Sequence, residues 1–113
     1  MSPQTPHHHT MDKIAALSEI LQLDPANAFA RYGLAMEYLS QNNTNAALTE
    51  FIALIEHNPD YVPGYQMSAQ TLAKLGRTEE ALDRLHNGIA AANRTGNQHA
   101  LAEMDALRED LSR

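Results

Sequence analysis

Apolar residues recur at helical spacing along most of the chain, in segments that prolines separate. The apolar residues of segments 12–22 and 97–111 fall three or four positions apart: Ile14, Leu17 and Leu21 in the first, Leu101, Met104, Leu107 and Leu111 in the second. Pro25, Pro59 and Pro63 lie between such segments, where helices start or stop. The sequence has no alternating run of β-branched residues, which would indicate a strand. The pattern predicts an all-α protein.

The chain matches itself at a shift of 34 residues. Asp24-Pro25 recurs as Asn58-Pro59. The same shift aligns small residues with small and large with large: Arg31 with Tyr65, Ala35 with Ala69, Tyr38 with Leu72, Ala47 with Ala81, Leu48 with Leu82 and Phe51 with Leu85. A shared offset over so many positions indicates a repeat of stacked helix pairs.

The repeated residues have physical roles within a helix pair. Ala35 and Ala47 predict a close approach of two helices, because larger side chains would push the helices apart. Asn42 and Gly76 occupy equivalent turns, where a left-handed backbone is expected. Asp24-Pro25 predicts an N-cap followed by proline at the first helical position, and Thr78 predicts a second N-cap.

These positions resemble the tetratricopeptide repeat (TPR) family. The first copy, residues 26–59, carries the family pattern at Leu34-Ala35, Tyr38, Ala47, Phe51 and Pro59. The second copy, residues 60–93, keeps Tyr65, Ala69, Leu72, Gly76, Ala81 and Leu85. It departs at Ser68, where the family has leucine, and at Asn93, where a closing proline would fall. The resemblance implies a right-handed α–α superhelical solenoid.

The flanking segments extend the two repeats to about six antiparallel helices. Residues 12–25 are predicted to form half a repeat, the second helix of a truncated leading pair. Residues 96–112 are predicted to form a capping helix with one apolar stripe. A single domain over residues 12–113 follows. Residues 1–11 carry two prolines and three histidines without a hydrophobic stretch, and are expected to be a disordered leader, either native or left by cloning.

The resemblance implies that the first helices of successive repeats line a concave groove that holds ligands. In the first repeat a second apolar stripe remains beside the Leu34 face, and the matching face of the second repeat is more polar. An apolar stripe left over after core packing is a candidate binding surface. The predicted groove residues are Phe29, Tyr32, Met36, Leu39, Gln66, Met67, Gln70 and Lys74.

Two of these residues have an alternative place in the core. Phe29 and Leu39 could pack on helix 12–22 instead, whereas Tyr32 and Met36, nearer the middle, favour the groove. Some TPR relatives bind the terminal carboxylate of a partner through lysines, an arginine and asparagines. Here Tyr32 and Met36 replace a lysine and an asparagine, and Lys74 is the one groove cation, so a role in reading C-terminal chaperone tails is not expected.

Composition narrows the classes of function. The formal net charge is −6, with acids spread along the chain, which argues against nucleic-acid binding. No apolar run reaches the length that a membrane span needs. The chain lacks cysteine, which excludes disulfides and fits a cytoplasmic location.

No cofactor, metal site or catalytic group of residues is expected. His7-His8-His9 lacks fixed geometry for a metal, and the other histidines are far apart in sequence. The acids Glu79, Glu80 and Asp83 are expected to form a solvated helix start rather than an acid–base site. We therefore expect no enzyme. The leading hypothesis is an adaptor or scaffold that binds a peptide or amphipathic helix in the groove; the alternative is a homodimer formed through the same apolar face.

Overall fold

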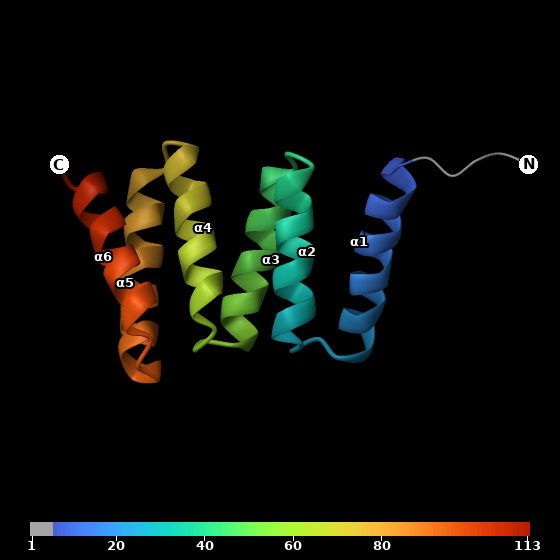
Figure 1. Ribbon diagram of the computed structural model, residues 1–113, viewed down its shortest axis with the longest axis horizontal. Helices are drawn as coiled ribbons and strands as arrows, with labels where there is room; N and C mark the ends of the chain where they lie inside the picture. Colours follow the sequence, from blue (N-terminus) through green and yellow to red (C-terminus); the bar gives the residue numbers. More distant parts are fainter. Residues whose placement is uncertain (1–5) are drawn as a thin grey trace, which may run out of the picture.

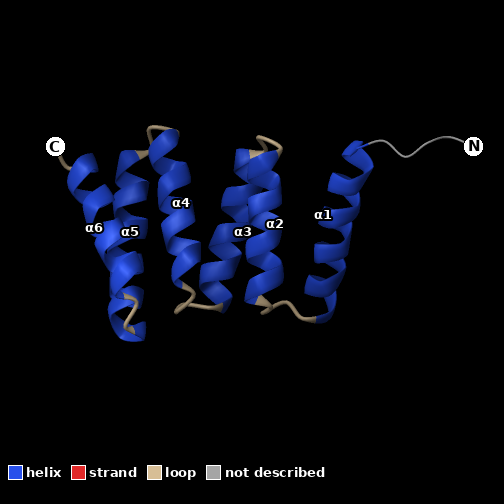
Figure 2. Ribbon diagram, viewed as in Figure 1, coloured by secondary structure: helices blue, strands red, loops and turns tan. Residues whose placement is uncertain are grey.

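The computed structural model describes the backbone of residues 6–113 and the side chains of residues 13–113. Over these residues the chain forms six helices and no strand: α1 Pro6–Leu23, α2 Ala28–Ser40, α3 Thr44–His57, α4 Val62–Lys74, α5 Thr78–Thr95 and α6 Gln98–Leu111. The helices run alternately up and down in a row along the 57 Å long axis, with α1 and α6 at opposite ends (Figures 1 and 2). The predicted all-α solenoid of six antiparallel helices is confirmed.

Helix α1 begins earlier than the sequence predicts. It starts at Pro6, so residues 6–11, which we assigned to a disordered leader, are helical; residues 1–5 lie outside the described residues. Proline suits this position because the first helical residues need no backbone N–H partner. The apolar face of α1 is as predicted, since Ile14 and Leu17 pack with the buried Leu21 against Leu34 of α2.

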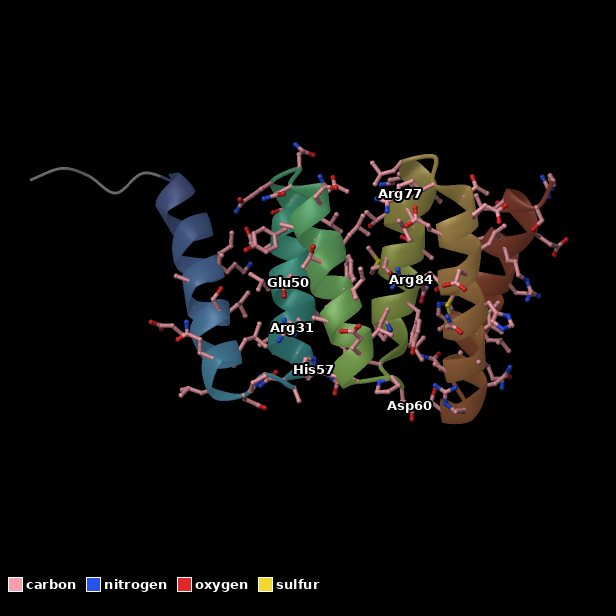
Figure 3. All side chains as sticks on the ribbon, turned by 180° about the vertical axis from the view of Figure 1, so that it is seen from behind. Arg31, Glu50, His57, Asp60, Arg77 and Arg84 are labelled. Atoms are coloured by element: carbon pink, nitrogen blue, oxygen red, sulfur yellow. The ribbon has the colours of Figure 1, made fainter. Side chains whose placement is uncertain are left out.

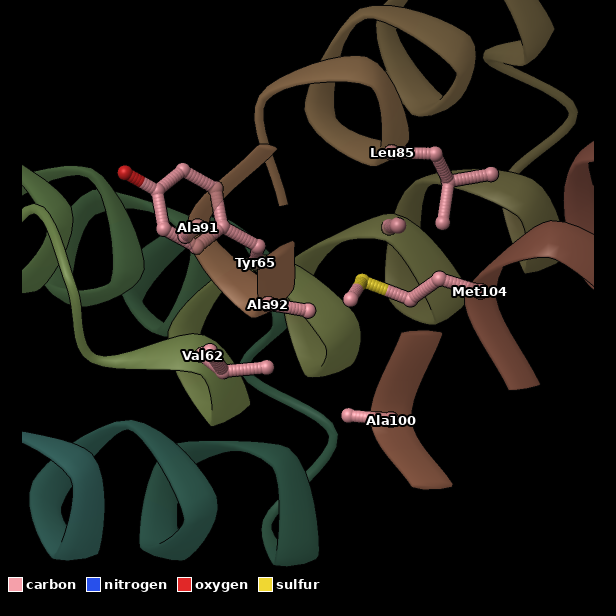
Figure 4. Packing of buried hydrophobic residues seen from close by; sticks show 8 residues of the cluster. Val62, Tyr65, Leu85, Ala91, Ala92, Ala100 and Met104 are labelled. Atoms are coloured by element: carbon pink, nitrogen blue, oxygen red, sulfur yellow. The ribbon is translucent and has the colours of Figure 1, made fainter. Parts of the chain in front are cut away.

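Small residues allow the helices of each pair to approach closely. Ala35 and Ala47 of the first pair, and Ala69 and Ala81 of the second, are fully buried. Gly88 of α5 sits in the tightest contact: a Cβ placed there would lie 2.6 Å from the Tyr65 Cβ and 2.7 Å from the Met104 Sδ. Figure 4 shows Tyr65 and Met104 in this cluster, where α4, α5 and α6 meet. Of the predicted stripe of the capping helix, Met104 is buried in this cluster, and Leu101, Leu107 and Leu111 are half-buried against it.

The turns inside the three hairpins share one geometry. Asn42, Gly76 and Gly96 have left-handed φ values of 60°, 76° and 73°. The next backbone N–H in each case donates to the carbonyl five residues back, as in Asn43 N to Tyr38 O at 2.9 Å and Arg77 N to Leu72 O at 3.0 Å. The prediction for the first two turns is confirmed, and the third turn follows the same rule.

Two predicted helix starts are wrong. Helix α2 is capped by Asn27, whose Oδ1 accepts from the Ala30 N–H at 2.9 Å, and Asp24-Pro25 lies in the turn before it. The amide side chain three residues closer to the helix reaches the free N–H groups. At α5 the N-cap is Arg77, without a side-chain cap bond, and Thr78 is the first helical residue.

Side chains at equivalent positions of the two repeats donate to a proline carbonyl in the loop before the helix. Arg31 donates from Nη2 to the carbonyl of Pro25 at 3.0 Å, and Tyr65, which aligns with Arg31, donates from its hydroxyl to the carbonyl of Pro59 at 2.6 Å. Each bond joins residues six apart, between the entry loop and the first turns of the following helix. Two different side chains therefore satisfy equivalent loop carbonyls in the two repeats.

We expect opposite effects from two glycine-to-alanine substitutions in helix interiors. Gly33→Ala should raise the free energy of unfolding by about 0.5–1 kcal/mol, because alanine favours helix and its Cβ would meet only Leu17 methyl groups at an ordinary 3.6 Å. Gly88→Ala should lower it by about 1–3 kcal/mol, because Tyr65 must shift. Urea unfolding followed by circular dichroism measures both. Equal gains at the two sites would contradict the described α4–α5 contact.

Gly76→Ala tests the turn geometry alone, because a Cβ at Gly76 would meet nothing within 4 Å. The left-handed φ should cost about 1 kcal/mol of unfolding free energy. Asn42→Gly, at the equivalent turn, is the control and should change stability by no more than a few tenths of a kcal/mol. A neutral Gly76→Ala would show that the turn adopts another conformation.

Candidate partner-binding groove

The predicted groove depends on which faces of α2 and α4 the fold leaves accessible. Ala30, Leu34 and Ala35 form the buried face of α2. The second stripe, predicted for the groove, is divided by the fold. Phe29 is 81% exposed, whereas Tyr32, Met36 and Leu39 are half-buried against the cluster around Phe51.

Phe29 and Leu39 do not pack on α1, the alternative place that the sequence left open for them. Phe29 is too exposed to be core, and Leu39 packs with residues of α3 and α4 instead of α1. Toward the C-terminal end of α2, Tyr38 packs with Leu34 in the cluster that α2 forms with α1. Helical spacing places Tyr38 one turn beyond Leu34, on the same face.

Tyr32 anchors α2 to the entry of α4. Its ring lies 6.4 Å from Phe51 and 5.8 Å from Tyr61, centroid to centroid, with tilted planes. Tilted aromatic pairs at these separations are favourable. Burial, and secondarily the neighbouring Tyr61, raises the pKa of the Tyr32 hydroxyl. Tyr32 therefore contributes to packing between repeats as well as to the surface.

A cavity of about 220 Å³ lies between the C-terminal ends of α2 and α4. Four of the eight predicted residues line it: Leu39, Met67, Gln70 and Lys74. Met67 and Leu39 are half-buried, while Gln70 and Lys74 are exposed. The structure thus brings half of the predicted set to one place and leaves Phe29, Tyr32, Met36 and Gln66 outside it.

Four further residues line this cavity and were missed: Asn42, Thr44, Thr71 and Leu75. Thr71 and Leu75 lie four and eight positions after Met67, so the helical spacing of α4 could have identified them. Asn42 lies in the turn between α2 and α3, and Thr44 is the first residue of α3, so spacing along α4 does not place them beside the cavity. The Thr71 hydroxyl already donates to the Met67 carbonyl at 2.8 Å.

Gln66 serves another contact. Its Nε2 donates to Oε1 of Glu103 on α6 at 2.8 Å, which links the second repeat to the capping helix. The bond holds the side chain toward α6, so Gln66 is separated from the cavity between α2 and α4.

Several charged residues have structural partners. Arg31 and Glu50 form an ion pair at 2.8 Å between α2 and α3, with both side chains largely buried (Figure 3). Glu80, in the acidic start of α5, accepts two bonds from Arg77 at 2.6 and 2.7 Å. The hydrogen bond from Arg77 lowers the pKa of the Glu80 carboxyl.

No group of three potential metal ligands occurs among the described residues, and the side chains of His7-His8-His9 lie outside them. Within the same part of the chain, no helix combines the length and apolarity that crossing a bilayer requires.

The chain is similar to known TPR proteins. A family model described as tetratricopeptide repeat matches residues 14–68. The tetratricopeptide repeat domain protein from Salinibacter ruber, solved by NMR, is 36% identical with a TM-score of 0.73, over 78% of this chain and 89% of that one. The co-chaperone DNJ1 of Cryptococcus neoformans, which contains a tetratricopeptide repeat and a J domain, is 38% identical over 54% of this chain; the match spans only 12% of that protein.

A more distant structure shares the fold. PcrH, crystallised in complex with the chaperone binding region of PopD, has a TM-score of 0.82 at 17% identity, over 93% of this chain and 80% of that one. The 34-residue period, the paired helices with shared turns and the close Salinibacter match lead to one conclusion: this chain belongs to the tetratricopeptide repeat family.

Proposed function

We propose that this chain is an adaptor that holds a peptide segment of another protein between α2 and α4. The TPR fold is a protein–protein interaction module, and the cavity of about 220 Å³ is the observation that supports this location. PcrH, which has the same fold, was crystallised with a segment of PopD. PcrH supports only the class of ligand, a peptide segment of another protein, because the two chains are alike in fold.

The cavity combines the features of a peptide site. Leu39, Met67 and Leu75 supply apolar contact, and methionine adapts its shape to different side chains. Asn42 and Gln70 place amide groups beside them, which can bond to a ligand backbone. Such a mixture of apolar lining and a few polar groups is typical of binding pockets.

Filling the cavity should weaken peptide binding. In Gln70→Trp the exposed glutamine becomes a ring that occupies the pocket, while the buried face of α4 is unchanged. We expect peptides selected on the wild type from a displayed random library to bind the variant at least tenfold more weakly, by fluorescence anisotropy. His86→Trp, at an exposed position on α5, is the control and should bind as the wild type does. Unchanged affinity in Gln70→Trp would place the site elsewhere.

A second candidate function is self-association through the exposed apolar residues Leu23 and Phe29. Phe29 at 81% exposure and Leu23 at 91%, on either side of the turn between α1 and α2, favour it. For a homodimer, sedimentation velocity over a concentration series should give a dimer for the wild type and a monomer for Phe29→Glu. A monomer at all concentrations for the wild type would eliminate this candidate.

A further inference from the structure

Lys74 is an exposed cation for which the described side chains 13–113 offer no acidic partner. All eight lysines and arginines of the chain lie within residues 13–113, and six of them lie within ion-pair distance of a carboxylate: Lys13, Arg31, Arg77, Arg94, Arg108 and Arg113. Arg84 is half-buried, and its charge acts on Glu80. Among the described side chains, no carboxylate pairs with Lys74.

No acid occurs among the described residues that line the cavity beside Lys74. Its other seven residues are neutral, so the site carries one positive charge in a chain whose net charge is −6. A local charge opposite in sign to its surroundings attracts a complementary group and confers specificity. The chemistry of the site therefore favours a ligand with a carboxylate near an apolar side chain.

The spacing along α4 sets the distance between the two ligand groups. Met67, Gln70 and Lys74 fall at i, i+3 and i+7, on one face of the helix. At 1.5 Å per residue, Lys74 lies roughly 10 Å beyond Met67 along the axis. An extended peptide covers that distance in about three residues, whereas a helical one needs about seven.

We propose that this site selects an extended peptide that carries one large apolar side chain and a carboxylate about three residues away. The apolar side chain occupies the cavity against Leu39 and Met67, and the carboxylate pairs with the Lys74 ammonium. The cavity of about 220 Å³ is smaller than a typical whole-ligand pocket, so it suits a single side chain. This inference rests on the proposed function and adds the chemistry of the partner.

The test is selection from a displayed library of random peptides on four proteins: the wild type, Lys74→Glu, Lys74→Arg and Gln70→Trp. We expect the wild type and Lys74→Arg to enrich Asp or Glu about three residues from a large apolar residue. Lys74→Glu should enrich Lys or Arg at that position. Wild-type peptides should lose about two- to fivefold in affinity when their acid becomes Gln, with a smaller loss at high salt.

The outcomes separate this inference from the proposed function. The role of Lys74 would be overturned if the selected peptides bound Gln70→Trp weakly but carried no acid. It would also be overturned if Lys74→Glu selected the same acidic peptides as the wild type. Both results would leave the groove between α2 and α4 in place. An acid preference at seven residues would overturn the extended ligand. Peptides that bind Gln70→Trp unchanged, or no enrichment on the wild type, would overturn the proposed site itself. Circular dichroism of each variant checks that the fold is retained.

Discussion

Two helices approach closely only where the residues between them are small, and this contact determines the arrangement of the whole stack. Ala35 and Ala47 provide it in the first pair, Ala69 and Ala81 in the second. Gly88 extends it to the point where α4, α5 and α6 meet, with Tyr65 and Met104 on either side. With the pairs fixed at short range, the large side chains Phe51, Leu54, Leu72 and Leu85 fill the space between neighbouring helices and are fully buried.

The fold could be predicted because its determinants are local and repeated. A 34-residue period, small residues at matched positions and left-handed turns at Asn42 and Gly76 each constrain neighbouring helices. The starts of helices were less predictable, because several polar residues compete to cap the same N–H groups. Asn27, instead of Asp24, caps α2 because it lies at the distance from which its side chain reaches the Ala30 N–H.

The candidate site could be predicted only in part, for a related reason. Helical geometry places Met67, Gln70 and Lys74 on one face of α4, so their proximity follows from sequence. The contribution of Asn42 and Thr44 depends on how the turn after α2 packs near the end of α4. Likewise, nothing in the spacing of α4 shows that Gln66 would bond to Glu103, since that contact crosses 37 residues of sequence. Pairwise packing between repeats decides these positions.

The hydrogen bonds of Arg31 and Tyr65 to the proline carbonyls six residues before them affect how fast the chain folds. They connect near neighbours in sequence, as do the bonds at the hairpin turns, so most of the structure can form without closing a long loop of chain. Proteins rich in such local contacts fold rapidly and can open from their ends while the middle stays intact. A ligand held between α2 and α4 would bridge two neighbouring repeats, and would slow the progress of that opening through the centre of the stack.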